Sequence, residues 1–210
     1  MIASAHQSRR ESPPVFNLPN CLTLGRLGLA VILFVLLDLR WMATSFLLFV
    51  IAASTDWLDG YLARKRGETT RLGRILDPFV DKVVVIGAFI FLLPEEEVGL
   101  APWMVTIVVA RELLVTGLRS YLESESVPFG ADWMGKMKMA MQCVAIGCIL
   151  FFLGVIRGPT YLFNQYAGTL DQWGEWIMRA AIWAAVLVTI ASGLSYSWRA
   201  AQLIRKGALA

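Results

Sequence analysis

The chain has 210 residues, of which 57% are hydrophobic and 17% are charged, and its formal net charge is +3 at pH 7. Soluble domains carry about 25% charged residues, so this composition excludes a large soluble domain and favours several membrane-spanning helices. The only histidine, His6, lies in a polar N-terminal stretch, and the three cysteines form no Cys-x-x-Cys pair. These features exclude a Ser-His or Cys-His catalytic pair and a histidine-rich metal site, and they give no indication of a disulfide framework.

Six apolar segments follow one another along the chain, and each has the roughly 20 residues that a membrane-spanning helix needs. They cover about residues 22–39, 41–62, 77–93, 101–122, 133–155 and 173–196. Tryptophans stand near the ends of several segments, as is typical of residues at a membrane interface. We therefore expect an all-α polytopic membrane protein with six transmembrane helices. Its membrane domain, residues 22–198, lies between an N-terminal segment, 1–21, and a C-terminal tail, 199–210.

The positive charges are distributed unevenly between the two ends of these segments. With the N-terminus in the cytoplasm, only Arg40, Arg157 and Arg179 lie toward the opposite face, and the other sixteen of the 19 Lys and Arg residues lie on the cytoplasmic half. This positive-inside bias predicts that both termini are cytoplasmic. Because the lipid bilayer accounts for the net positive charge, no nucleic-acid partner is expected.

Four aspartates interrupt the second and third apolar segments. Asp56 and Asp59 are three residues apart and Asp77 and Asp81 are four residues apart, so each pair shares one face of a helix. Buried carboxylates repel one another and are costly to desolvate, which makes such a cluster favourable only when cations neutralise it. Oxygen ligands without histidine indicate Mg²⁺ or Mn²⁺, with Ca²⁺ as the other hard cation to consider.

Structural explanations exist for single members of this cluster. Asp77 precedes a proline, which fits a helix N-cap, and Asp81 could pair with its neighbour Lys82. Gly60 and Gly73 could simply permit close helix packing. None of these explanations accounts for four carboxylates in helical phase on two consecutive segments.

The region around the aspartates contains the pattern D-x-x-D-G-x-x-A-R, then eight residues, then G-x-x-x-D-x-x-x-D. This pattern resembles the signature of the CDP-alcohol phosphotransferase family, and six spans with cytoplasmic termini are also similar to what that family shows. The chain matches every defined position of the signature, at Asp56, Asp59, Gly60, Ala63, Arg64, Gly73, Asp77 and Asp81.

The resemblance implies the fold of that family and a reaction in which a phosphatidyl group passes from CDP-diacylglycerol to an alcohol and CMP is released. It implies that Asp56, Asp59 and Asp77 ligate a pair of divalent metal ions. It also implies that Asp81 completes the metal site and acts as general base on the acceptor hydroxyl. A homodimer in a bacterial cytoplasmic membrane, with its active site facing the cytoplasm, follows from the same resemblance.

A CDP-lipid site around the same motif is a further implication. In family members the cytidine nucleotide lies against small residues and an arginine contacts phosphate, and residues 17–26 resemble the family's P-N-x-L-T-x-x-R segment. The residues expected to bind the CDP-lipid are Asn20, Thr23, Asp59, Gly60, Ala63, Arg64, Thr70 and Gly73. Arg26 could belong to this site, or it could snorkel to the membrane interface from one turn inside its span.

Two further segments bear on the acceptor alcohol. Residues 111–119 resemble an R-E-x-x-V-x-G-L-R segment of the branch that uses sn-glycerol 3-phosphate, and residues 135–142 resemble its G-K-x-K-T-x-x-Q segment, with Met139 in place of threonine. The dianionic phosphate of this acceptor needs cations beside the carboxylates. The residues expected to bind it are Arg111, Arg119, Lys136 and Lys138. Alternatively, the lysines only follow the positive-inside bias and Arg111 pairs with Glu112 or a metal-site carboxylate.

Transfer of the phosphatidyl group to glycerol 3-phosphate, in phosphatidylglycerol synthesis, is the function that these segments favour. Synthesis of phosphatidylinositol phosphate is the alternative within the family, since its acceptor also carries a phosphate. A cation transporter is the alternative from another class, because it too places aspartates in spanning helices. A transporter would not need small residues at fixed spacing beside them.

Overall fold

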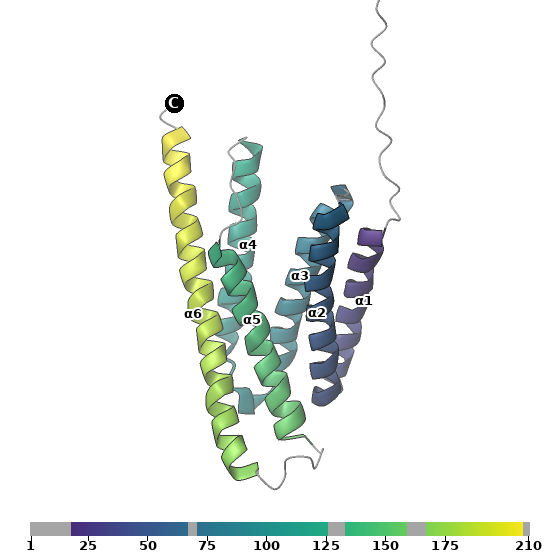
Figure 1. Cartoon of the computed structure of the whole chain (residues 1–210). Helices are drawn as coiled ribbons and strands as arrows, with labels where there is room; N and C mark the ends of the chain where they lie inside the picture. Colours follow the sequence, from purple (N-terminus) through teal and green to yellow (C-terminus); the bar gives the residue numbers. More distant parts are fainter. Residues whose placement is uncertain (1–17, 67–70, 126–132, 159–166, 208–210) are drawn as a thin grey trace, which may run out of the picture.

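The structure, a computed structural model, is a bundle of long helices (Figure 1). It describes the backbone of residues 18–66, 71–125, 133–158 and 167–207, and the side chains of residues 24–55, 79–125, 133–158 and 171–205. The long helices are α1 (Leu18–Asp38), α2 (Met42–Arg66), α3 (Arg71–Leu92), α4 (Pro102–Ser124), α5 (Trp133–Phe151) and α6 (Ala167–Gly207). A 3₁₀ helix, η1 (Glu96–Val98), precedes α4, and a π-helical turn, η2 (Phe152–Ile156), follows α5. The described elements are all helical, which confirms the all-α prediction.

Each predicted apolar segment corresponds to one of the long helices. Helix α1 begins at Leu18, slightly earlier than expected, and α6 continues to Gly207, so most of the predicted C-terminal tail extends the last helix. Helix α3 begins at Arg71, which places Asp77 inside the helix, and the interpretation of Asp77 as an N-cap is therefore wrong. The start of α1 and the end of α6 lie at the same end of the bundle (Figure 1).

Two stretches are long and apolar enough to cross a membrane, judged on the described residues. They are Trp133–Ile156, formed by α5 and η2, and Asp171–Arg205 in α6, while Met42–Thr55 of α2 is a shorter apolar stretch. Large apolar side chains such as Trp183 and Leu187 are exposed on the outside of the bundle. An apolar outer surface of this kind is typical of helices that face lipid, so the bundle has the character of a membrane protein.

Helix α5 lies in the middle of the apolar core. Ala145, Ile146, Ile149 and Leu150 are completely buried, and their spacing gives one broad apolar stripe along the helix. The same cluster contains side chains from the other five long helices, among them Leu37, Phe49, Phe89, Val105 and Ile182. This core fixes the relative positions of the helices that carry the charged residues of the site.

Ion pairs connect the loops at the end of the bundle opposite the two described termini. Arg157, directly after η2, donates hydrogen bonds to Glu97 at 2.7 Å and to Asp171 at 2.6 Å. In the same region Nε of Arg40 lies 3.4 Å from a carboxylate oxygen of Glu95. These side chains are partly exposed, so the pairs orient the connections and contribute little to the free energy of unfolding.

The backbone of η2 approaches the start of α2 closely at Gly154. A Cβ atom on Gly154 would lie 2.5 Å from the backbone nitrogen of Ala43 and 2.6 Å from the carbonyl carbon of Met42. Because main-chain atoms cannot be moved aside by a rotamer change, only glycine fits here without a shift of α2. Gly147 of α5 differs, since a Cβ atom there would meet nothing within 4 Å.

Replacement of Gly154 by alanine is expected to destabilise the protein by about 1–3 kcal/mol, the usual cost of overpacking. Gly147→Ala is the matched control, and it is expected to be neutral or stabilising by up to about 1 kcal/mol because alanine is the better helix former. Thermal unfolding of the purified variants in detergent measures both effects. A midpoint for Gly154→Ala at or above that of the wild type would contradict the close approach of η2 and α2.

Candidate active site

Asp81 of α3 forms an ion pair with Arg26 of α1. Its Oδ1 accepts a hydrogen bond from a terminal guanidinium nitrogen of Arg26 at 2.9 Å. Arg26 is only 8% exposed, so the interpretation that it snorkels to the membrane interface is wrong. The neighbouring Lys82 is directed elsewhere and donates to the hydroxyl of Thr116 on α4. Helix α1 therefore orients the carboxylate that the sequence predicts as general base.

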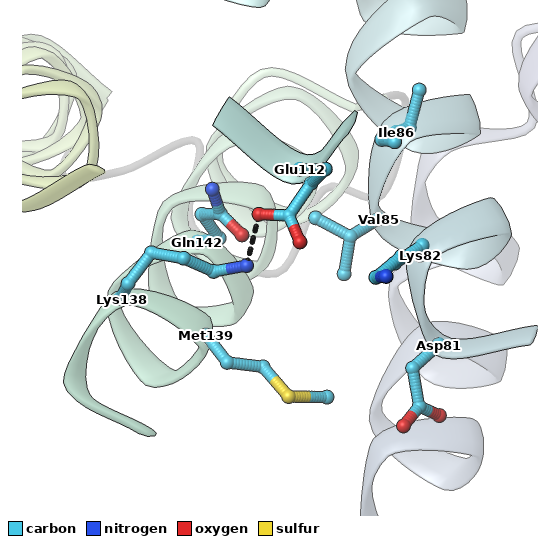
Figure 2. Close-up of a pocket in the computed structure, with 8 residues that line it drawn as sticks. All are labelled: Asp81, Lys82, Val85, Ile86, Glu112, Lys138, Met139 and Gln142. Atoms are coloured by element: carbon cyan, nitrogen blue, oxygen red, sulfur yellow. Dashed lines mark hydrogen bonds and ion pairs between the residues drawn. The ribbon is translucent and has the colours of Figure 1, made fainter. Parts of the chain in front are cut away.

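A cavity of about 130 Å³ opens beside Asp81, between α3, α4 and α5 (Figure 2). Charged or polar side chains face it from all three helices. Its lining residues are Asp81, Lys82, Val85, Ile86, Glu112, Lys138, Met139 and Gln142. One water molecule requires roughly 10–15 Å³ of such a volume, so the cavity has room for a small polar molecule.

Glu112 is the centre of a buried ion-pair network on the wall of this cavity. Its Oε1 accepts hydrogen bonds from the ammonium of Lys138 and, at 3.3 Å, from the guanidinium of Arg111. Figure 2 shows Glu112 of α4 and Lys138 of α5 meeting at this contact. All three side chains are buried, and buried charges are stable only when they are paired and hydrogen-bonded. One carboxylate therefore serves two cations.

Arg111 extends from Glu112 toward α6. It donates a hydrogen bond to the hydroxyl of Ser192 at 2.5 Å, and its guanidinium carbon lies 5.5 Å from the centre of the Tyr196 ring, within cation–π range. Gly193 provides the space, since a Cβ atom there would lie 3.1 Å from Cγ of Arg111. The pairing of Arg111 with Glu112 that the sequence left open is thus confirmed, and contact with an acceptor phosphate stays a prediction.

The other predicted phosphate ligands differ in their relation to the cavity. Arg119, further along α4, donates a hydrogen bond to the hydroxyl of Tyr196 at 3.3 Å. Lys136 is exposed in the first turn of α5. Of the four cations predicted to bind the acceptor phosphate, Lys138 is the one that lines the cavity. The structure therefore brings together Lys138 and, through Glu112, Arg111, but places Arg119 and Lys136 outside the cavity wall.

Three polar residues of the cavity were not predicted as site residues from the sequence. They are Lys82, Glu112 and Gln142, whose amide donates a hydrogen bond to Thr189 of α6 at 3.0 Å. Each had a signal in the sequence. Lys82 directly follows Asp81, and Glu112 and Gln142 belong to the two segments that resemble the glycerol 3-phosphate branch.

A second cavity, of about 70 Å³, shares Asp81 with the first and is lined by residues of α1, α2, α3 and α5. Its lining residues are Arg26, Phe49, Ala52, Ala53, Asp81, Val84, Val85, Met139 and Cys143. Asp81, Val85 and Met139 line both cavities. Met139, which stands where the family segment usually has threonine, is therefore one of the side chains between the two cavities.

The other predicted metal ligands lie on α2 and α3, and described residues of both helices line the second cavity. Asp56 and Asp59 are in α2 and Asp77 is in α3, and their side chains lie outside the described part of the chain. Ala52 of α2 lines the second cavity together with Asp81, and position 56 follows one helical turn later on the same face. This backbone register fits a carboxylate site for divalent cations. Among the described side chains, no group of three His, Cys, Asp or Glu residues is placed to hold a metal ion.

The contacts of the predicted CDP-lipid residues stay predictions. Asn20 and Thr23 belong to the first turns of α1, and Thr70 lies outside the described residues. The other residues predicted to bind the CDP-lipid belong to α2 and α3, and their side chains lie outside the described part of the chain. They are Asp59, Gly60, Ala63 and Arg64 of α2 and Gly73 of α3.

Comparison with known proteins identifies the family. The model of the CDP-alcohol phosphatidyltransferase family matches residues 16–193, and the chain belongs to this family. The CDP-diacylglycerol--glycerol-3-phosphate 3-phosphatidyltransferase of Bacillus subtilis is 33% identical over 205 residues, which cover 89% of this chain and 97% of the relative. A protein of the same name in Haemophilus influenzae is 36% identical over 65% of this chain and 76% of the relative. Another in Rickettsia bellii is 34% identical over 86% of this chain and 93% of the relative.

Replacement of Glu112 by glutamine is expected to destabilise the protein by roughly 3 kcal/mol, because it leaves two buried cations without their shared carboxylate. The double variant Glu112→Leu with Lys138→Met is expected to recover part of this loss, because it removes one of the two buried cations while Arg111 still lacks its carboxylate. Glu123→Gln, at an exposed position of α4, is the matched control. Unfolding in detergent gives the free energies, and equal stability of the Glu112→Gln and Glu123→Gln variants would contradict the network.

Proposed function

We propose that the protein transfers the phosphatidyl group of CDP-diacylglycerol to sn-glycerol 3-phosphate, forming phosphatidylglycerophosphate and CMP. The observation that carries this proposal is the cavity beside Asp81 with the ammonium of Lys138 on its wall. The acceptor has a hydroxyl that must lose a proton and a dianionic phosphate that must be held, so it needs a base and cations in one small site. The names of the relatives support the same reaction.

The chemistry assigns a distinct task to each side of the cavity. The acceptor hydroxyl oxygen attacks the phosphorus that carries the diacylglycerol, a new P–O bond forms, the bond to the CMP oxygen breaks, and the hydroxyl proton passes to Asp81. Arg26 holds the Asp81 carboxylate in place. Lys138 attracts the acceptor phosphate as a point charge, supported by Glu112. The remaining cations assigned to this phosphate are Arg111, Arg119 and Lys136.

Two divalent cations, Mg²⁺ or Mn²⁺, are assigned to Asp56, Asp59, Asp77 and Asp81. Carboxylate oxygens are the ligands that these hard cations prefer, and the register of α2 and α3 around Asp81 supports the assignment. When bound, the ions neutralise charge on the transferred phosphoryl group and on the leaving CMP. The residues assigned to the CDP-lipid are Asn20, Thr23, Asp59, Gly60, Ala63, Arg64, Thr70 and Gly73.

The proposal includes an arrangement in the membrane. All six long helices span a bacterial cytoplasmic membrane, and residues 22–198 form the membrane domain. Both termini and the active site face the cytoplasm. The enzyme is a homodimer. Two observations support the membrane part. The stretches Trp133–Ile156 and Asp171–Arg205 have the required length and apolar character, and Arg40 and Arg157 lie at the end away from the described termini.

The acceptor is tested by CMP release from purified protein in detergent with CDP-diacylglycerol and Mg²⁺. Glycerol 3-phosphate, inositol phosphate, serine and phosphatidylglycerol are offered in separate reactions, and turnover is expected with glycerol 3-phosphate alone. Asp81→Asn is expected to lower kcat by about 10²–10⁴-fold, the usual contribution of a general base. Asp38→Asn, at the exposed end of α1, is the control and should keep wild-type activity. Turnover with another acceptor instead would overturn the assignment of the acceptor.

The topology is tested by labelling single cysteines in a variant whose own three cysteines are replaced by serine. With a membrane-impermeant maleimide on intact spheroplasts, Glu96→Cys in η1 is expected to be labelled, because η1 lies at the outer end of the bundle. Ser124→Cys at the end of α4 is expected to be labelled only after permeabilisation. The reverse pattern would place the cavity's end of the bundle outside the cell.

A further inference from the structure

Among the described residues that line the cavity, Lys82 is the cation to which the proposed reaction gives no role. It follows Asp81 on α3, and successive helical residues diverge by about 100°, so it faces α4 while Asp81 faces α1. Its ammonium donates to the hydroxyl of Thr116, and this hydroxyl donates to the carbonyl oxygen of Glu112 at 2.7 Å. Because a lysine has three N–H donors, the ammonium keeps donors for a ligand in the cavity.

The charges around the cavity do not balance among the described side chains. Asp81 is matched by Arg26, and Glu112 is the carboxylate shared by Arg111 and Lys138. The ammonium of Lys82 rests on a neutral hydroxyl and lines the same cavity. Apart from the Arg26–Asp81 pair, these described side chains carry three positive charges, on Arg111, Lys138 and Lys82, and one negative charge, on Glu112. This excess of positive charge favours an anion in the cavity.

We propose that Lys82 is a further ligand of the acceptor phosphate and selects for an acceptor that carries one. This inference rests on the proposed function. Lys82 approaches the cavity from α3 and Lys138 approaches it from α5, so a phosphate between them is held from two helices (Figure 2). Lys82 is next to Asp81 in the chain, so α3 supplies both groups that act on the acceptor. Asp81 deprotonates the hydroxyl of the acceptor, and Lys82 binds its phosphate.

The test measures the KM values for both substrates and the inhibition constant of inorganic phosphate in CMP-release assays. In Lys82→Met the KM for glycerol 3-phosphate and the inhibition constant of phosphate are expected to rise at least about tenfold, the size of one lost charge-assisted hydrogen bond. The KM for CDP-diacylglycerol and kcat should stay close to the wild-type values. Lys82→Arg, which keeps the charge, is expected to recover most of the loss.

The controls separate this role from the alternatives. Arg179→Met removes an exposed cation paired with Glu175 on α6 and should leave every constant unchanged. A purely structural role for Lys82, as a tie between α3 and α4, would lower the unfolding midpoint and raise both KM values together, and this result would overturn the inference. So would an unchanged KM for glycerol 3-phosphate. Absence of turnover in the wild type with glycerol 3-phosphate would instead remove the proposed function itself.

Discussion

The buried carboxylate of Glu112 is the interaction on which the site depends. It lies between α4 and α5, accepts hydrogen bonds from Lys138 and Arg111, and through Arg111 connects to Ser192 of α6. Two buried cations on neighbouring helices would repel each other in an apolar bundle without a carboxylate between them. Glu112 therefore permits positive charge to be fixed at a depth where water cannot screen it, and charge fixed in that way acts strongly on an anionic ligand.

The cavity separates this network from a second, independent ion pair. Arg26 holds Asp81 from α1, on the far side of the cavity from Glu112 and Lys138. Among the described side chains, the Arg26–Asp81 pair and the Glu112 network have no residue in common, so the base and the anion-binding wall are oriented by different contacts. Both are attached to helices whose positions the apolar core fixes, and a preorganised site of this kind needs little rearrangement when charge moves during the reaction.

The sequence predicted the helices and the chemistry better than it predicted the contacts. Apolar segments of spanning length and the regular spacing of Asp77 and Asp81 are local features of the sequence. Such features can be read from the sequence because they do not depend on how the helices pack against one another. The pair Arg26–Asp81 joins residues 55 positions apart, so it depends on how α1 packs against α3, which periodicity does not encode. The same holds for Gly154, whose need for glycine comes from the backbone of α2 and not from its own helix.

The two lysines of the cavity differ in what binding an anion would cost them. Lys138 is buried against Glu112, and moving it would leave a carboxylate without its partner in an apolar environment. Lys82 is only partly buried and rests on a hydroxyl, which satisfies a donor but carries no charge to neutralise it. A phosphate can therefore draw the ammonium of Lys82 from Thr116 at a small cost, while Lys138 stays fixed. One fixed cation on α5 and one on α3 that is held only by a hydroxyl therefore suit a dianion that must be bound and released.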